Sequence, residues 1–205
     1  MIVKVCGMRD PENIRQVERT GADWMGFIFY PRSPRYVAER PAYLPQRMRR
    51  VGVFVNAEEA DIRRHIADYG LEAVQLHGQE RPELCAALRK DGTTVIKAFR
   101  LKTAAEAAAT ADYEGAADYF LFDTPTEAFG GSGHRFDWSL LDHYRGKTPF
   151  LLSGGIGPDS LDALSRFHHP CWAGIDLNSG FETAPARKDA EQLTLFIELF
   201  NQLSV

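Results

Sequence analysis

Short runs of apolar, β-favouring residues recur along the whole chain, and most are followed by a more polar stretch with helical periodicity. The runs predict eight strands, Ile2–Cys6, Trp24–Phe29, Val51–Val55, Ala73–Leu76, Thr94–Phe99, Tyr119–Asp123, Pro149–Ser153 and Ala173–Asp176. The amphipathic stretches between them predict helices over Ile62–Tyr69, Leu84–Leu88, Ala104–Ala111 and Leu193–Leu203. Strands therefore alternate with helices from one end of the chain to the other.

Residue types at two of the helix starts agree with this alternation. Asp10 followed by Pro11 predicts an N-cap with proline at the first helical position. Asn56, with Glu59 three residues later, has the spacing of a capping box and predicts a second helix start.

Strands that alternate with helices predict a parallel sheet joined by right-handed crossovers. Eight such units, with no linker and no low-complexity tract, predict a single (β/α)8 TIM barrel over residues 1–205. An open, doubly wound sheet is the alternative, but the eight units show no six-strand grouping. In a barrel of this α/β class the active site lies at the carboxyl ends of the strands. The residues that end each strand are therefore the candidates for function.

Composition narrows the choice of partner. Of the 205 residues 44% are apolar and 25% are charged, and the formal net charge is −4. These values are ordinary for a globular protein and argue against nucleic acid as a partner. The basic cluster Arg47–Arg50 is interpreted as a solvated helix end. No stretch approaches the roughly 18 apolar residues of a membrane span, and the N-terminus lacks the apolar region of a signal peptide.

The cysteine count bears on the compartment. Cys6, Cys85 and Cys171 are too few and too scattered for a disulfide framework or a zinc site. The histidines show no metal-ligand spacing beyond the adjacent pair His168 and His169. We therefore expect a protein of the reducing cytoplasm that carries no metal and does not associate with a membrane.

Two segments near the C-terminus, Leu151–Ile156 and Gly174–Gly180, run from a strand into a turn of small residues. Glycine lets backbone N–H groups approach a bound group closely, and converging amides bind anions. The loops after the last two strands of a barrel commonly hold a phosphate, so we expect a phosphorylated small molecule. The alternative is that both are ordinary strand-to-helix connections. The candidate binding residues are Gly154, Gly155, Ile156, Asn178, Ser179 and Gly180.

The first predicted strand ends in a cysteine followed by a glycine. Alternation places Lys4 and Cys6 on the same side of the strand. A neighbouring ammonium lowers the pKa of a thiol, which would make Cys6 a general base or a nucleophile at working pH. The alternative is a buried and inert cysteine, the common state of a free cysteine in an apolar strand.

The sixth predicted strand ends in a carboxylate, Asp123, after three apolar residues. Apolar surroundings would keep this carboxyl partly protonated and therefore able to act as an acid. The glycine-rich segment Gly130–Gly133 follows and predicts a mobile lid over the site. The alternative for Asp123 is a helix N-cap, although no helical pattern begins before about Trp138.

Three further side chains stand at predicted strand ends or in the loops after them. Arg35 lies in a loop stiffened by two prolines, where a fixed guanidinium suits the capture of a carboxylate or phosphate. A solvated surface arginine is the alternative. His77 ends the fourth strand and is either a packing residue or a part of the site. Asp176 ends the eighth strand beside the first, where it would pair with Lys4 or accept a hydroxyl of the substrate.

Together these segments resemble the phosphoribosylanthranilate isomerase family of tryptophan biosynthesis. The resemblance covers essentially the whole chain, and Met8, Asn178 and Phe181 are mild departures that remove no chemical group. It rests on eight segments in order: Lys4–Met8, Ser33–Val37, Val51–Val55, Gln75–Gly78, Phe122–Thr124, Gly130–Gly133 with Phe136–Trp138, Leu152–Ile156 and Asp176–Glu182.

The resemblance implies an Amadori rearrangement of N-(5'-phosphoribosyl)anthranilate without cofactor or metal. Cys6 would be the general base and Asp123 the general acid. Arg35 would hold the anthranilate carboxylate, and backbone amides near Gly155, Ile156, Asn178 and Ser179 would hold the phosphate. We expect a monomer or a weak homodimer.

Three other functions fit parts of the sequence. The related barrel isomerase of histidine synthesis has an aspartate where this chain has Cys6. It acts on a substrate with two phosphates, and the acidic loop from Asn56 to Glu59 has no group that would bind the second one. A Schiff-base aldolase would use Lys97, which lies inside the fifth predicted strand, short of its end. A non-catalytic phosphosugar-binding module would lack the acid or the base, and this chain has both Cys6 and Asp123.

Overall fold

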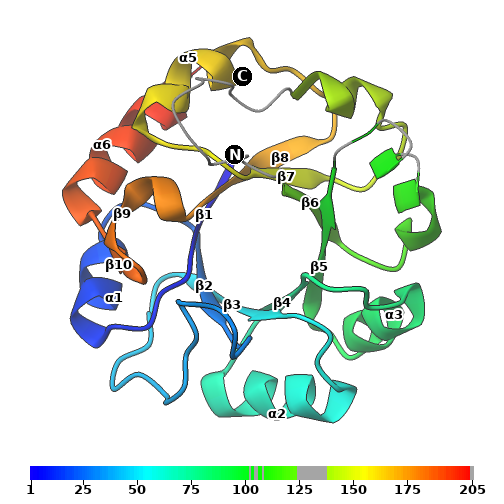
Figure 1. Cartoon of the computed structure of the whole chain (residues 1–205), viewed down its shortest axis with the longest axis horizontal. Coiled ribbons are helices and arrows are strands. Elements are labelled where there is room, and N and C mark those ends of the chain that lie inside the picture. The colour runs from blue at the N-terminus through cyan, green and yellow to red at the C-terminus, as the bar shows by residue number, and fades with distance from the viewer. Residues whose placement is uncertain (102, 104–105, 108, 124–137, 204–205) are drawn as a thin grey trace.

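The computed structural model describes residues 1–101, 103, 106–107, 109–123 and 138–203. Eight parallel strands form a closed barrel in chain order, and β8 pairs back with β1 (Figure 1). The strands are β1 (Ile2–Cys6), β2 (Trp24–Ile28), β3 (Arg49–Phe54), β4 (Ala73–Leu76), β5 (Thr94–Arg100), β6 (Tyr119–Asp123), β7 (Phe150–Ser153) and β8 (Trp172–Leu177). The predicted barrel is confirmed, and every predicted strand overlaps an observed one.

Helices cover the outside of the ring in Figure 1. They are α1 (Pro11–Val17), α2 (Glu59–Tyr69), α3 (Pro82–Lys90), α5 (Leu161–Arg166) and α6 (Ala190–Asn201). Four 3-10 turns occur in the described chain, η1 (Ala109–Tyr113), η2 (Trp138–His143), η3 (Pro158–Ser160) and η4 (Ser179–Phe181). A small antiparallel hairpin, β9 (Glu182–Ala184) with β10 (Arg187–Lys188), lies between β8 and α6. The predicted helix over Ala104–Ala111 lies partly outside the described residues, and the predicted lid Gly130–Gly133 lies wholly outside them.

The two predicted helix starts have opposite outcomes. Asp10 caps α1 as predicted, because its side chain accepts a hydrogen bond from the Asn13 N–H at 2.8 Å. The predicted capping box is wrong: α2 begins at Glu59 after Glu58, and no side chain caps it. Asn56 instead adopts a positive φ of 51°. Its N–H donates to Glu80 and its Oδ1 accepts from Gln79, so partners in the loop after β4 replace the cap.

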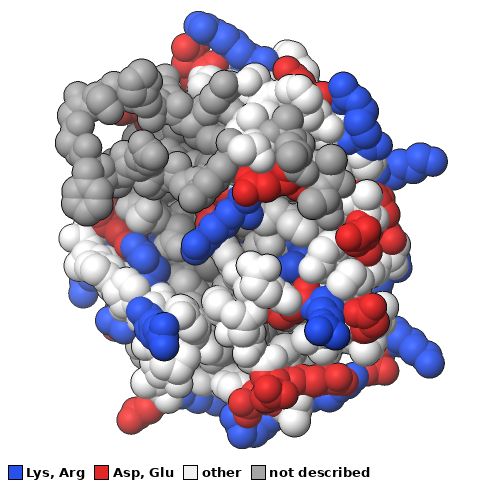
Figure 2. Space-filling view, turned by 45° about the vertical axis from the view of Figure 1, so that its right-hand side comes forward, with Lys and Arg blue, Asp and Glu red and all other residues white. Residues whose placement is uncertain are grey.

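The basic cluster Arg47–Arg50 is not a helix end either, because Arg49 and Arg50 begin β3. The Arg50 guanidinium donates to the carbonyl oxygens of Pro45 and Tyr69, at 3.0 Å in each case. Arg50 thus links the backbone before β3 to the C-terminal end of α2. On the face drawn in Figure 2, basic and acidic side chains are interspersed and do not gather in one basic field.

Burial divides the apolar residues into two clusters. The larger one lies between the barrel and its helices. The smaller one consists of alternate strand residues, among them Trp24, Val51 and Leu121, as expected for side chains that fill the inside of the barrel. Polar side chains replace apolar ones on this inner face at the carboxyl ends of the strands, where the next layer includes Cys6 and Asp176.

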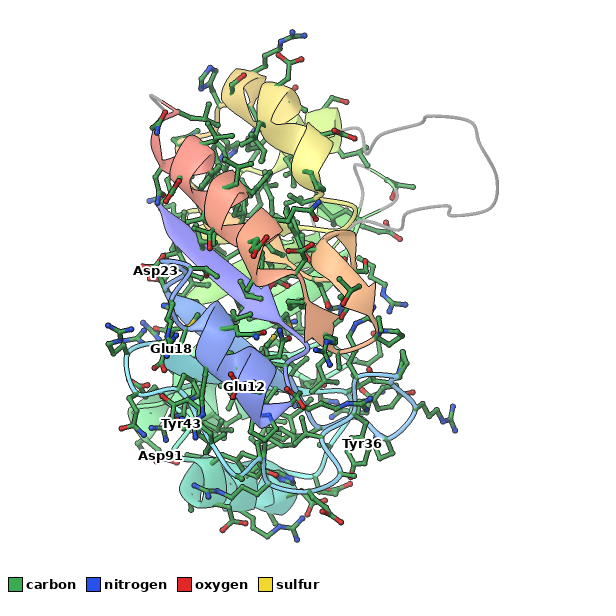
Figure 3. All side chains as sticks on the ribbon, turned by 90° about the vertical axis from the view of Figure 1, so that its left-hand side faces the viewer. Glu12, Glu18, Asp23, Tyr36, Tyr43 and Asp91 are labelled. Carbon is green, nitrogen blue, oxygen red and sulfur yellow. The ribbon has the colours of Figure 1, made fainter. Side chains whose placement is uncertain are left out.

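Figure 3 shows the barrel from the side, with α1 and α6 in front of β1. Asp23 and Asp91 lie before strands β2 and β5 and mark the amino-terminal end of the barrel. Tyr36, in the loop after β2, lies toward the opposite end. None of the helices in the described part of the chain is long and apolar enough to cross a membrane.

Gly174 is a sensitive point of the barrel closure, because a Cβ at this position would lie 2.0 Å from the Ile2 carbonyl oxygen in β1. The atom in the way belongs to the Ile2 backbone, which is paired with β8 and has little room to relax, so we expect Gly174→Ala to destabilise the protein by about 1–3 kcal/mol or more. Urea unfolding followed by circular dichroism measures this loss. Gly157→Ala is the control, since its nearest non-neighbouring atom would be 3.9 Å away. Equal losses in both variants would contradict the prediction.

Candidate active site

The carboxyl ends of the strands enclose a cavity of about 380 Å³. It is lined by most of the residues proposed from the sequence and by several others. The proposed residues in the lining are Cys6, His77, Asp123, Gly154, Gly155, Ile156, Asp176, Asn178 and Ser179. A larger cavity of about 950 Å³ adjoins it and shares His77, Asp123 and Asn178 with it. Arg35 lines the larger cavity. Thiol, carboxyl and glycine turns therefore meet at one end of the barrel.

Cys6 is buried at the end of β1, and the neighbouring strand leaves space for its sulfur. It pairs in register with Gly26 of β2, where a Cβ would lie 2.7 Å from the Cys6 Sγ. Lys4, two residues earlier, is fully buried and donates to Asp176 Oδ1 at 2.8 Å. Of the two roles open to Asp176, the structure shows the pairing with Lys4. Ser153 also donates to Asp176, at 3.4 Å.

The charge on the Cys6 thiol depends on its burial and on its neighbours. Burial raises the pKa of Cys6 above its ordinary value, and the positive charges of Lys4 and Lys188 offset this rise only in part. Lys4 does lower the pKa of Cys6, but the expected net lowering is wrong, because the sequence does not show how strongly burial disfavours the thiolate. Burial alone would lower the pKa of Lys4, but Asp176 and the thiol raise it, so this lysine stays charged.

Asp123 ends β6 on the opposite side of the ring from β1 (Figure 1). Its Oδ2 lies 3.2 Å from His77 Nε2, and the other ring nitrogen of His77 contacts the Gln75 side-chain amide at 2.8 Å. His77 is thus a member of the site that orients the carboxyl. The side chain of Asp123 is 25% exposed and 4.0 Å from Arg100 Nε. The apolar surroundings expected from its strand are therefore incomplete, since its final position in β6 opens onto the cavity.

The two glycine turns lie against each other. Gly154 and Gly155 have φ angles of +85° and +66°, a left-handed conformation that favours glycine. Gly180 does not line the smaller cavity. It packs closely against the first turn, because a Cβ there would lie 2.3 Å from the Ile156 carbonyl oxygen. Gly154 and Gly155 both line the smaller cavity, and a turn of this kind is suited to present backbone amides to an anion.

Arg35 does not stand free in its loop. Its guanidinium donates to Glu182 through Nε at 2.8 Å and through Nη2 at 2.5 Å. Glu182 also accepts from the buried Lys188 at 2.6 Å, and Lys188 donates to Asn178 at 2.7 Å. Neither Glu182 nor Lys188 was predicted as a site residue from the sequence. Glu182 is the last residue of Asp176–Glu182, a segment that resembles the family, and this was the one sequence signal for it. No sequence pattern pointed to Lys188.

Lys97, the candidate for Schiff-base chemistry, is held in place by three acceptors. Its ammonium donates to Glu80 at 2.9 Å and to the carbonyl oxygens of Leu76 and Gly78 at 3.1 and 2.8 Å. Its side chain is 2% exposed. A charged and fully hydrogen-bonded ammonium is a poor nucleophile, so the geometry disfavours the aldolase. Within the described part of the chain, no group of three His, Cys, Asp or Glu side chains could hold a metal ion.

A closed parallel barrel that brings a thiol, a carboxyl and two glycine turns together at the carboxyl ends of its strands has the architecture of a TIM-barrel enzyme. Comparison with known proteins specifies the family. The profile of N-(5'-phosphoribosyl)anthranilate isomerase matches residues 3–199. A protein of that name from Phocaeicola vulgatus is 55% identical over 98% of this chain and 98% of its own length.

Solved structures agree. The phosphoribosylanthranilate isomerase of Thermotoga maritima is 35% identical and superposes with a TM-score of 0.82, covering 99% of this chain and 100% of the other. A phosphoribosylanthranilate isomerase in complex with reduced 1-(o-carboxyphenylamino)-1-deoxyribulose 5-phosphate is 33% identical, with a TM-score of 0.80 over 99% of this chain and 100% of the other. The chain belongs to the N-(5'-phosphoribosyl)anthranilate isomerase family.

Proposed function

We propose that Cys6 and Asp123 are the base and the acid of the reaction that defines this family. That reaction, and the function of this chain, is the Amadori rearrangement of N-(5'-phosphoribosyl)anthranilate to 1-(2-carboxyphenylamino)-1-deoxyribulose 5-phosphate in tryptophan biosynthesis. The observation that supports the assignment of roles is the shared cavity, into which β1 brings the thiol and β6 brings the carboxyl from the other side of the ring.

The reaction needs one proton delivered and one removed. Asp123 protonates the ring oxygen of the ribose as the C1–O bond breaks, and the nitrogen lone pair forms the Schiff base. The Cys6 thiolate then takes the proton from C2, and the electron pair of that C–H bond forms the enolamine. Tautomerisation gives the ketone, so the rearrangement needs no external oxidant or reductant. Two groups on opposite sides of the substrate suffice.

The remaining contacts hold the substrate between these groups. The backbone amides near Gly155, Ile156, Asn178 and Ser179 bind the phosphate, supported by the left-handed turn at Gly154 and Gly155. Arg35 binds the anthranilate carboxylate from the wall of the larger cavity. The reacting carbons are thereby fixed at both ends, and this binding energy lowers the cost of orientation.

The proposed setting follows from the same chemistry. We propose a cytoplasmic enzyme, because its three cysteines are free and suit a reducing compartment. Its partner is the small phosphorylated substrate, and it uses no cofactor. A monomer or a weak homodimer is proposed, and a structural relative from Thermotoga maritima is described as dimeric, with monomers generated from it.

One assay tests the proposed function directly. Purified protein mixed with N-(5'-phosphoribosyl)anthranilate should consume it, and the fluorescence of the substrate should decay at a rate proportional to enzyme concentration. Heat-denatured protein is the control for spontaneous hydrolysis. A decay no faster than this control would overturn the assignment.

A further inference from the structure

Glu182 is the centre of a buried charge cluster and has no role in the mechanism above. Its side chain is 6% exposed and contacts Arg35 on one side and Lys188 on the other. The bond from the Arg35 guanidinium raises the pKa of the arginine. Burial would raise the pKa of Glu182, but its bonds to Arg35 and Lys188 lower it. The carboxylate is therefore charged and holds both cations.

The bond occupies only one edge of the guanidinium. Glu182 takes the edge formed by Nε and Nη2. Arginine has five N–H donors in a planar fork, so the end formed by Nη1 and Nη2 keeps two parallel donors for a second carboxylate. Arg35 also lines the larger cavity, next to the proposed catalytic groups. One carboxylate of the protein can thus fix the arginine while a carboxylate of the substrate binds its other end.

The charge balance favours a second carboxylate. Glu182 is shared between two cations, Arg35 and Lys188, so this three-residue cluster keeps one formal positive charge. The buried Lys188 ammonium also pairs with the Glu182 carboxylate, so that carboxylate neutralises Arg35 only in part. Removal of Glu182 would leave two cations close together and free the guanidinium to leave its place.

The stem of Arg35 and the carboxylate of Glu182 are each held by backbone. A Cβ on Gly7 would lie 2.6 Å from Arg35 Cδ, so the arginine stem passes directly over the residue that follows Cys6. In the β9–β10 hairpin, Ala186 has a φ of 65° and its N–H donates to Glu182 Oε1 at 3.0 Å. The guanidinium is therefore clamped between the end of β1 and the hairpin after β8.

We propose that Glu182 is a positioning residue for substrate specificity, which holds the Arg35 guanidinium so that its free end receives the anthranilate carboxylate. This inference rests on the proposed role of Arg35. The hairpin after β8 thereby takes part in choosing the substrate, although it contributes no group to the proton transfers.

The test compares two substrates in each variant: N-(5'-phosphoribosyl)anthranilate and N-(5'-phosphoribosyl)aniline, which lacks the carboxylate. The preference is the ratio of kcat/KM for the first to that for the second. Glu182→Gln should lower kcat/KM for the anthranilate compound about tenfold, mainly through KM, and change the value for the aniline compound less than about twofold. The preference falls accordingly.

Four further variants separate positioning from general damage. Arg35→Ala should abolish the preference, and Glu182→Gln added to it should reduce the preference no further, because the two residues act as one unit. Lys188→Met removes the other cation of the cluster but leaves Glu182 bonded to Arg35, so the preference should fall less than in Glu182→Gln. Glu182→Asp keeps the charge on a shorter arm and should reduce the preference less than Glu182→Gln, which gives a result even where the glutamine variant does not fold.

Other results would overturn the inference. Equal losses on both substrates in Glu182→Gln would show a structural role, and a stronger preference would show that Glu182 competes with the substrate for Arg35. An unchanged preference in Glu182→Asp, with Glu182→Gln unfolded, also speaks against it. Failure of the proposed function is a separate outcome, because the wild-type protein would then isomerise neither compound.

Discussion

Replacement of Cys6 with serine should lower kcat by about 10²- to 10⁴-fold and change KM by less than about threefold. A serine hydroxyl fits the space that Gly26 leaves for the sulfur, so the fold and the binding contacts remain. It does not ionise in the working pH range, however, and so cannot take the proton from C2. Steady-state kinetics on N-(5'-phosphoribosyl)anthranilate measure both constants.

A second cysteine provides the matched control. Cys171 lies just before β8, at the end of the barrel away from the cavity, and its Sγ donates to the Gly146 carbonyl oxygen at 3.6 Å. Cys171→Ser should leave kcat within about twofold of the wild type, since a hydroxyl can make the same bond. A similar fall in both variants, or an unchanged kcat in Cys6→Ser, would remove Cys6 from the role of base.

The pH dependence of the reaction follows from the raised pKa of the Cys6 thiol. Because burial raises the pKa of Cys6, the thiolate is lost as pH falls through that raised value, and the base form increases as pH rises. At about pH 6 and at about pH 8 most of the thiol is protonated, but the thiolate fraction is larger at the higher pH. The kcat/KM of the wild type, which reports the ionisable groups of the free enzyme, should therefore be larger at about pH 8 than at about pH 6. The same profile measured for Cys6→Ser should lack this rise. A flat profile in the wild type would contradict the prediction.

The barrel could be predicted because its signal is local and repeated. Each strand is a short apolar run that ends in a polar residue or a glycine, and eight runs in order have few other ways to pack. Cys6 and Asp123 were found for the same reason, since each ends such a run. His77 was a candidate for the same reason, but it lies 46 residues from Asp123 in sequence, and their contact appeared only in the structure.

The features that the sequence did not reveal depend on distant partners. Glu182 lies 147 residues from Arg35 and reaches it through the closure of the barrel. The direction of the Cys6 pKa shift depends on how deeply Lys4 and the thiol are buried together, which no spacing along β1 expresses. Asn56 has the spacing of a cap, but Glu80 and Gln79 from the next loop provide its partners. In each case a long-range contact outweighs a local pattern.

Replacement of Asp123 with asparagine is the second large effect that we expect. The amide has nearly the shape of the carboxyl and can still contact His77, so the cavity should keep its form. It cannot deliver a proton to the ring oxygen, and kcat should fall by about 10²- to 10⁴-fold while KM changes little. Calorimetric titration with reduced 1-(o-carboxyphenylamino)-1-deoxyribulose 5-phosphate should show binding close to that of the wild type.

The control for this variant lies just before the same strand. Asp118 immediately precedes β6, and its side chain is 26% exposed, almost as Asp123 is. It accepts from Arg89 Nε at 2.6 Å and from the Val95 N–H at 2.9 Å, both at the amino-terminal end of the barrel. Asp118→Asn should therefore cost stability and leave kcat within about twofold. If Asp123→Asn loses affinity in place of kcat, Asp123 binds the substrate and another group delivers the proton, because only a group that acts in the transition state lowers kcat with binding intact.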